Sequence, residues 1–298
     1  MNAIEIRNLQ KNFGQKQALA GLNMTVPQGA IYGFIGENGS GKSTTEKLIC
    51  GLLVPSGGEI KLFGKDYKDA AVRSKIGVLI EAPGCFPNYS VWNNMMLQAA
   101  NLNIKDAAEE VRKVLRLVRM EGSAGNKFKN CSLGMKQRIG IAMALLGKPE
   151  LLVLDEPING LDADGMLIMR EVLVDITHNY GCTVVISSHI LGELEKIATH
   201  YGIVRGGKMI REMTAEELNA DCRTYVALQT GDMQTAMTAL QRRYVRVAFE
   251  NEYLRVYDAE SAEEVAAYLY QNGIVVTELG TDKISLEEYY IDLMKERC

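Results

Sequence analysis

Short apolar runs separated by glycine, proline and polar clusters dominate the first quarter of the chain, and this pattern predicts β-strands. The expected strands cover residues 3–9, 22–26, 31–35, 58–62 and 76–80. A single helix, over residues 44–50, is expected directly after the third run, where a glycine-rich segment ends. The chain therefore opens with a sheet-forming region that contains one early helix.

In residues 84–147 the spacing of the apolar side chains changes to that of helices. Segments 91–101 and 106–120 place apolar side chains at helical spacing, as at Val111, Val114 and Val118. From residue 150 to residue 215 the pattern returns to alternating strands and helices, and it ends in a hairpin around a Gly-Gly turn. We expect residues 1–215 to form one α/β domain, with a helical subdomain at about 84–147.

The rest of the chain, residues 222–298, predicts a second, smaller α+β domain. Strands are expected at 223–229, 245–249, 253–257 and 274–279, and helices at 232–243 and 261–271. This βαββαβ order is that of the ferredoxin-like split motif. A last helix over 285–297 opens with Ser285 and Glu288 in a capping-box pattern. The domain could be regulatory, a dimer contact or a structural cap.

Composition and charge narrow the classes of function. The chain has 298 residues, of which 47% are hydrophobic and 23% charged, as in ordinary globular proteins. The formal net charge of −4 and the lack of a long basic run give nucleic-acid binding no electrostatic support. No apolar stretch approaches the ~20 residues that span a bilayer, and the start lacks the apolar core of a signal peptide. Six cysteines without a C-x-x-C pair predict reduced thiols and a cytoplasmic location.

The most informative motif follows the apolar run at 31–35. It has the form G-x-x-x-x-G-K-[ST] and consists of Gly36, Glu37, Asn38, Gly39, Ser40, Gly41, Lys42, Ser43 and Thr44. A glycine loop between a strand and a helix lets backbone N–H groups converge on phosphate oxygens at the helix N-terminus. Lys42 is expected to reach the β- and γ-phosphates, and the Ser43 hydroxyl to ligate Mg²⁺.

A second apolar run, residues 151–154, ends in Asp155 and Glu156. Ligands of open α/β sheets bind at the carboxyl ends of strands, so both acids should face the nucleotide. Asp155 is expected to hold Mg²⁺, directly or through water. Glu156 is expected to polarise the attacking water as a general base.

About twenty residues before this run lies a third motif, with Ser132, Leu133, Gly134 and Met135 ahead of a helical pattern. Ser132 is placed as an N-cap and Gly134 permits close backbone approach, so a second anion site at a helix N-terminus is expected. The segment resembles the signature motif of ATP-binding-cassette (ABC) ATPases, with Leu-Gly-Met replacing the commoner Gly-Gly-Gln. The resemblance implies a P-loop NTPase fold, with Ser132, Gly134 and Met135 binding ATP.

The same resemblance assigns further residues. Residues 159–162 resemble the family's D-loop, which links opposed active sites across a dimer. His189, at the end of an apolar run, resembles the switch histidine that contacts the γ-phosphate. Phe13 occupies the place where the family stacks an aromatic ring on adenine. The alternative for Phe13 is a core position near the first strand.

Glu81 departs from the wider family, which has glutamine at this place beside Mg²⁺ and the attacking water. A carboxylate can also ligate Mg²⁺, but it adds charge and lacks an amide donor. The acid, together with the Ser-Leu-Gly-Met segment, resembles one branch, the bacitracin-transport and lantibiotic-immunity ATP-binding subunits.

The resemblance implies a subunit that hydrolyses ATP by head-to-tail dimer closure, as a homodimer or with a second ATP-binding subunit. It would drive a separate membrane permease near residues 81–89, at the inner face of the cell membrane, and export or confer immunity to a peptide or antibiotic. The alternative is a soluble, non-transport ATPase of the same superfamily that acts on another macromolecular complex.

Overall fold

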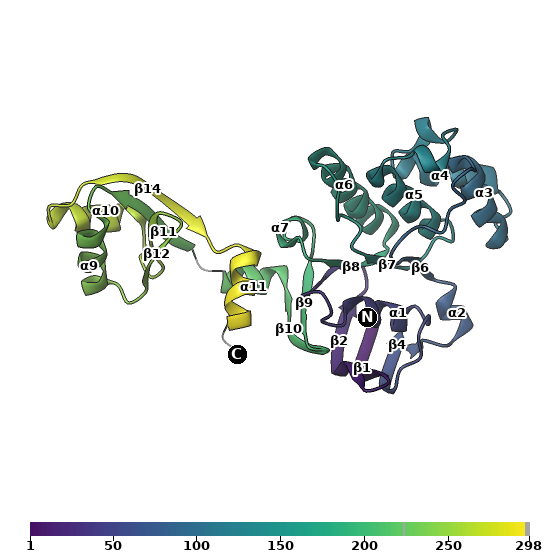
Figure 1. The fold of residues 1–298 in the computed structure, drawn as a ribbon, viewed down its shortest axis with the longest axis horizontal. Coiled ribbons are helices and arrows are strands. Elements are labelled where there is room, and N and C mark those ends of the chain that lie inside the picture. The colour runs from purple at the N-terminus through teal and green to yellow at the C-terminus, as the bar shows by residue number, and fades with distance from the viewer. Residues whose placement is uncertain (223, 296–298) are drawn as a thin grey trace. The chain divides into compact units, whose positions relative to one another are not determined.

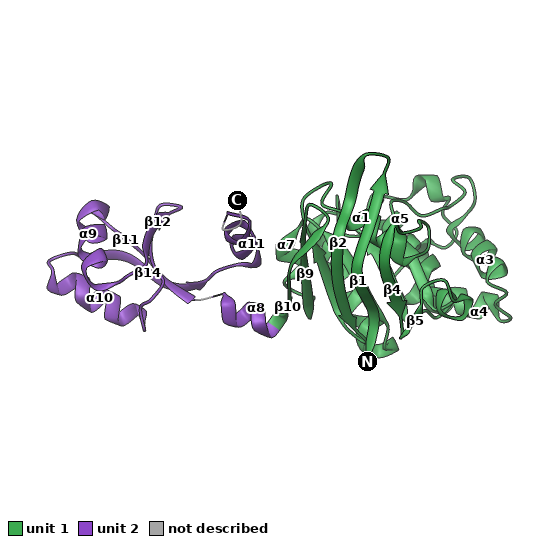
Figure 2. Ribbon diagram, turned by 90° about the horizontal axis from the view of Figure 1, so that it is seen from below, with its two compact units in different colours: residues 1–215 green, residues 216–298 purple. Residues whose placement is uncertain are grey.

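The computed structural model describes residues 1–222 and 224–295. The chain divides into two compact units, Met1–Ala215 and Glu216–Cys298, coloured separately in Figure 2. The predicted start of a strand at Arg223, the predicted end of the last helix at Arg297 and the sixth cysteine, Cys298, lie outside the described residues. Each unit is considered by itself.

A six-stranded sheet forms the centre of unit 1, and its strand order is β10-β9-β3-β8-β7-β6. All neighbours pair in parallel except β10, which lies antiparallel at one edge. The strands are β3 (Ile31–Ile35), β6 (Ile76–Leu79), β7 (Leu151–Asp155), β8 (Thr183–Ser188), β9 (His200–Arg205) and β10 (Lys208–Thr214). Because β3, β7 and β8 are parallel neighbours, their carboxyl ends share one edge, where the phosphate loop and both predicted acids begin.

A second, antiparallel sheet has the order β2-β1-β4-β5. Its strands are β1 (Asn2–Phe13), β2 (Lys16–Pro27), β4 (Gly57–Leu62) and β5 (Lys65–Asp66). β1 and β2 are longer than predicted, because their pairing continues through irregularities to a turn at Gly14, past the point where apolar side chains stop alternating. Backbone hydrogen bonds hold this extension, so the hydrophobic pattern did not reveal it.

Helix α1 (Lys42–Ile49) contacts a strand of each sheet, β2 and β7. It begins at Lys42, within the phosphate-loop motif, two residues before the predicted start. Its Leu48 joins Leu22 of β2 and Val153 of β7 in one core of fully buried side chains. The phosphate loop is therefore anchored on both sides by packed apolar structure.

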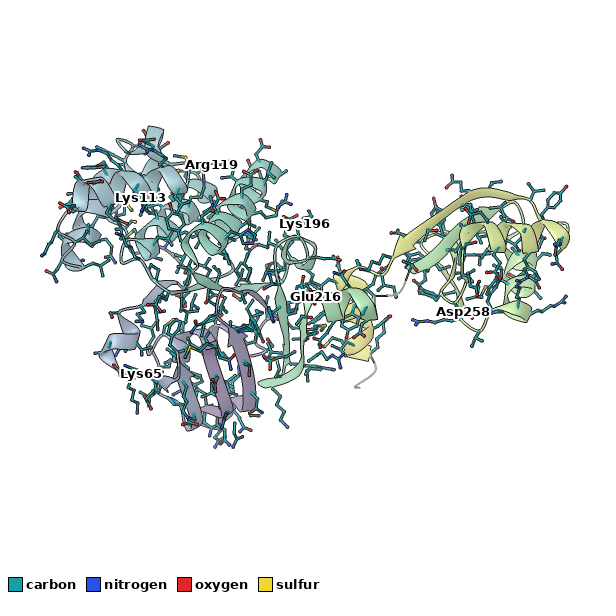
Figure 3. All side chains as sticks on the ribbon, turned by 180° about the vertical axis from the view of Figure 1, so that it is seen from behind. Lys65, Lys113, Arg119, Lys196, Glu216 and Asp258 are labelled. Carbon is teal, nitrogen blue, oxygen red and sulfur yellow. The ribbon has the colours of Figure 1, made fainter. Side chains whose placement is uncertain are left out.

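The predicted helical region of unit 1 contains α3 (Val91–Asn101), α4 (Ala107–Leu117) and α5 (Leu133–Leu145), which contact one another and group beyond β6 in Figure 1. α4 ends before the predicted residue 120, and Arg119 has a left-handed φ of 56°. Other α-helices of this unit are α2 (Ala70–Arg73), α6 (Ala163–Tyr180) and α7 (Leu191–Leu194), and short 3₁₀ helices at Glu121–Ser123 and Phe128–Asn130 lie between α4 and α5. Figure 3 shows Lys65, Lys113 and Lys196 on the outer surface of this unit.

Unit 2 contains a four-stranded antiparallel sheet of order β12-β13-β11-β14, with two helices in the predicted βαββαβ sequence. Its core joins Val226 and Leu254 of the sheet to Leu240 and Leu269 of the helices. β14 extends to Lys283, beyond the predicted residue 279, because it pairs with the whole of β11. The elements are α8 (Ala215–Asp221), β11 (Thr224–Thr230), α9 (Met233–Arg243), β12 (Val247–Glu250), β13 (Tyr253–Val256), α10 (Ala262–Gln271), β14 (Val276–Lys283) and α11 (Leu286–Lys295).

Candidate functional site

The glycine loop turns the chain from β3 into α1. Gly39 and Gly41 have φ values of 82° and 115°, which side-chain-bearing residues rarely adopt. A Cβ at Gly36 would lie 2.5 Å from the Val204 carbonyl oxygen, so that position also has no room for a side chain. The three glycines are thus required by backbone shape.

Lys42 lies inside this loop and is almost fully buried. Its Nζ donates to the carbonyl oxygens of Gly36 at 2.6 Å and Glu37 at 3.2 Å. Gly41, the N-cap of α1, supplies no side-chain cap, so the first N–H groups of the helix remain suited to an anion. The Ser40 hydroxyl is buried without a hydrogen-bond partner among the described residues. The loop therefore presents a cation and backbone donors in one place.

Asp155 is the last residue of β7, and it connects three elements. Its Oδ1 accepts a hydrogen bond from Ser187 of β8 at 2.9 Å and another from Ser43 of α1 at 3.3 Å. The structure thus brings together two of the three predicted Mg²⁺ ligands, Ser43 and Asp155, but not the third, Glu81. Ser187, which the sequence motifs do not include, orients the Asp155 carboxylate.

Glu156 follows with a φ of 48°, a left-handed conformation uncommon outside glycine. Its N–H donates to the Ser187 hydroxyl at 3.1 Å. Its Oε2 accepts from Asn159 Nδ2 at 3.1 Å and lies 2.7 Å from His189 Nδ1. The predicted base and the predicted switch histidine are therefore in direct contact, and Asn159 of the D-loop segment holds the same carboxylate oxygen.

Glu46, one turn into α1, was not singled out by sequence. Its side chain is fully buried, and neither carboxyl oxygen has a hydrogen-bond partner of good geometry among the described residues. Burial raises the pKa of this carboxyl well above its usual range, and the charge of Asp155 raises it further, while the Ser187 hydroxyl and Lys42 act in the opposite direction. The sequence did contain one indication of its importance. Glu46 is an acid on the buried face of α1, which also carries Thr45 and Ile49.

The donor set fits a hydrated Mg²⁺ that arrives with a nucleotide. The Ser43 hydroxyl and the Asp155 carboxylate are hard oxygen ligands, and the partnerless Glu46 oxygens are further acceptors close to Asp155. Within residues 1–222 and 224–295, no group of three or more His, Cys, Asp or Glu side chains could hold a metal by itself. Phosphates and water would complete the coordination, as is usual for Mg²⁺.

The signature segment begins α5. Ser132 is its N-cap, and its hydroxyl accepts from the Met135 N–H at 3.3 Å. A Cβ at Gly134 would lie 3.4 Å from Leu161, and one at Gly160 would lie 2.9 Å from Leu133. The signature segment and the D-loop segment thus pack closely within one subunit.

Two predicted residues lie apart from these contacts. Glu81 has a left-handed φ of 66°, and its exposed carboxylate pairs with Lys47 Nζ at 2.7 Å. This contact holds the pKa of Glu81 below its usual range and that of Lys47 above its own. Phe13, at the end of β1, is 47% exposed, and Lys11 Nζ lies 4.9 Å from its ring centroid. The alternative that placed Phe13 in the core is wrong.

The glycine loop after β3, its buried lysine and the paired acids at the end of β7 define a P-loop nucleotide-binding domain. A family profile described as ABC transporter matches residues 19–159. The bacitracin transport ATP-binding protein BcrA of Enterococcus faecalis is 36% identical over 98% of this chain and 96% of its own length. The chain therefore belongs to the ATP-binding subunits of ABC transporters.

A further sequence relative and a solved structure support the same family. The lantibiotic transport ATP-binding protein SrtF of Streptococcus pyogenes is 39% identical over 70% of this chain and 90% of its own. Among solved structures, cbiO1 from Clostridium perfringens, described as part of the ABC transporter complex cbiONQ, has a TM-score of 0.67 and 25% identity, over 81% of this chain and 96% of its own. The expected α/β P-loop fold of the ABC type is confirmed.

As a member of this family the chain is an ATPase that uses ATP and Mg²⁺. Such subunits work in transporter complexes with a membrane permease and a second ATP-binding subunit. No helix in the described part of the chain is both long and apolar enough to cross a membrane.

Proposed function

We propose that this chain powers the export of a peptide-type antibiotic, or immunity to one, by driving a separate membrane permease. The names of BcrA and SrtF, a bacitracin and a lantibiotic transport protein, support this substrate class. In this proposal residues 1–215 are the motor, with a helical subdomain at 84–147, and residues 222–298 are an accessory domain. The chain binds no nucleic acid and lies against the inner face of the membrane through its permease.

The contact between Glu156 and His189 is the observation that carries the proposed chemistry. Glu156 accepts a proton from the attacking water, and His189 and Asn159 hold its carboxylate in place. Asp155 and Ser43 would hold Mg²⁺, which would neutralise charge on the phosphates. Lys42 leaves its two carbonyl partners to bind the β- and γ-phosphates.

The second half of each site comes from another subunit. Ser132, Gly134 and Met135 of one subunit bind ATP held by the phosphate loop of its partner, and Phe13 stacks on the adenine. ATP then contacts both subunits and favours closure, and hydrolysis removes the bridging γ-phosphate. The partner is a second copy of this chain or a related ATP-binding subunit. Glu81, which pairs with Lys47 apart from Ser43 and Asp155 in this structure, is the third ligand in this proposal and would link Mg²⁺ to the permease.

An affinity pull-down from detergent-solubilised membranes tests whether this chain binds a membrane permease. Expression of the chain together with the recovered protein then tests whether the two export an antibiotic. A multi-span membrane protein should be recovered with the chain. Co-expression of both in a susceptible host should raise the minimum inhibitory concentration of bacitracin or of a lantibiotic, and Lys42→Ala should abolish the increase. Recovery of a soluble complex alone would favour the non-transport ATPase.

A further inference from the structure

Glu46 lies in the second turn of α1, three residues after Ser43, so the two side chains share one face of the helix. Its exposed fraction is 0%, and neither carboxyl oxygen has a hydrogen-bond partner of good geometry among the described residues. Asp155 and Ser187 are close enough to affect the pKa of the carboxyl through charge and side-chain hydrogen bonding. An acid in this setting is unusual, because a buried polar group without a partner destabilises the folded state.

The neighbouring donors are already committed to other acceptors. The Ser187 hydroxyl donates to Asp155 and accepts from the Glu156 N–H. The Ser43 hydroxyl also donates to Asp155. Lys42 donates to two loop carbonyl groups. The hydrogen bonds of good geometry made by these neighbours therefore go to other acceptors, and the Glu46 oxygens can still accept hydrogen bonds beside the predicted Mg²⁺ ligands.

We propose that Glu46 belongs to the divalent-cation site, where its carboxyl oxygens accept hydrogen bonds from water molecules bound to the cation. This inference rests on the proposed function, in which Ser43 and Asp155 hold that cation. Mg²⁺ keeps several of its waters in proteins, and each water brings two protons that need acceptors. The positive charge of the cation favours the ionised form of Glu46, whose two carboxylate oxygens next to Asp155 accept these protons. The waters on the cation are then the donors that the described residues do not provide.

A purely structural role makes a different prediction. If position 46 only filled space between α1 and β7, an apolar residue would serve better, since it would remove two unsatisfied oxygens. Replacement by leucine would then raise stability and leave metal binding unchanged. If Glu46 instead accepts hydrogen bonds from the waters on the cation, the same replacement should weaken metal binding. Groups that hydrogen-bond to metal ligands typically contribute ~10–100-fold to affinity.

Mn²⁺ is a suitable probe, because the electron paramagnetic resonance signal of the free ion reports its binding directly. The intact chain, saturated with a non-hydrolysable ATP analogue, is titrated with Mn²⁺ for wild type, Glu46→Leu and Glu46→Gln. Asp155→Asn is the positive control, and Glu59→Gln, which removes an exposed acid on β4, is the charge control. Thermal unfolding of each variant checks that it is folded.

We expect Glu46→Leu to raise the Mn²⁺ dissociation constant by about 10–100-fold. Glu46→Gln, which keeps one oxygen acceptor, should lie between leucine and wild type, and Glu59→Gln should match wild type. Wild-type affinity in Glu46→Leu, with weak binding in Asp155→Asn, would overturn the role of Glu46 and leave the proposed function standing. Wild-type affinity in Asp155→Asn would overturn both. If Glu46→Leu does not fold, Glu46→Gln decides, and a dissociation constant equal to that of wild type refutes the inference.

Discussion

His189 Nδ1 lies 2.7 Å from Glu156 Oε2, and this contact joins the ends of two adjacent parallel strands, β8 and β7. The two residues are 33 positions apart in sequence. The parallel register places Asp155 opposite Ser187, so the residues that follow each strand emerge side by side. A base and its positioning histidine are thus assembled by sheet topology, and they meet beside the glycine loop.

Replacing Glu156 with glutamine should stop hydrolysis and spare nucleotide binding. Glutamine keeps the size of the side chain and can still contact Asn159, but it cannot accept a proton from water. Loss of a general base typically lowers the rate ~10²–10⁴-fold. Phosphate release measures the rate, and a fluorescent ATP analogue measures affinity. Gel filtration with ATP should show an accumulated dimer. Turnover near that of wild type would remove Glu156 from its role.

The sequence predicted those parts of the site that reside in contiguous motifs. Gly36–Thr44, Asp155 and Glu156 could be assigned because a strand, a glycine loop and a strand-end acid each leave a local pattern. The α/β domain was also predicted, since the central strands β3 and β8 are buried throughout and appear in the sequence as apolar runs.

The parts that the sequence did not reveal depend on contacts between distant segments. Ser187 bridges Asp155 and the Glu156 backbone only because β8 lies next to β7. Glu81 pairs with Lys47, 34 positions earlier in the chain, and has a left-handed backbone conformation that no local signal encodes. Backbone pairing likewise extended β1, β2 and β14 past the end of their hydrophobic alternation.

Mixed subunits should reveal whether the signature segment acts on a partner's nucleotide. Lys42→Ala removes the phosphate-binding lysine, and Gly134→Asp places a like charge where ATP phosphates are expected. In a heterodimer of the two variants, both defects fall in one composite site and the other site is intact. Partial ATPase activity should therefore appear in the mixture and in neither variant alone. Differential tags confirm that heterodimers form. If they form without any recovered activity, the two sites are either not shared or must both function.

Glu81→Gln should change the metal dependence of the ATPase. The substitution is nearly isosteric and keeps a carbonyl acceptor, so ATP binding should survive. It removes a negative charge and the ion pair with Lys47, so we expect a modest loss of basal activity and a raised Mg²⁺ requirement. A permease adapted to the acid should also stimulate the variant less.

A magnesium titration with and without the permease measures these effects. Lys47→Gln is the matched control, because it breaks the same ion pair and leaves the Glu81 carboxylate in place. Superimposable curves for wild type and Glu81→Gln would refute a special role for the acid. Identical changes in both variants would assign the effect to the ion pair instead of to Mg²⁺.

Burial of Glu46 should make the stability of the metal-free protein depend on pH. An unfolded chain releases the Glu46 proton near the ordinary pKa of 4.5, whereas burial keeps the folded carboxyl protonated to much higher pH. The folded state then binds more protons than the unfolded state above pH 4.5, so the contribution of Glu46 becomes increasingly unfavourable as pH rises toward the folded pKa. Glutamine does not titrate, and it escapes this penalty.

Glu46→Gln should therefore unfold at nearly the wild-type temperature around pH 4.5 and at a higher temperature than wild type at pH 7.5, with EDTA present in both series. Differential scanning calorimetry measures the two midpoints, and the difference between variants cancels the other titrating groups that they share. Glu59→Gln, at an exposed position, should show no such widening gap. A constant difference between wild type and Glu46→Gln across this pH range would mean that the buried carboxyl titrates like an exposed one.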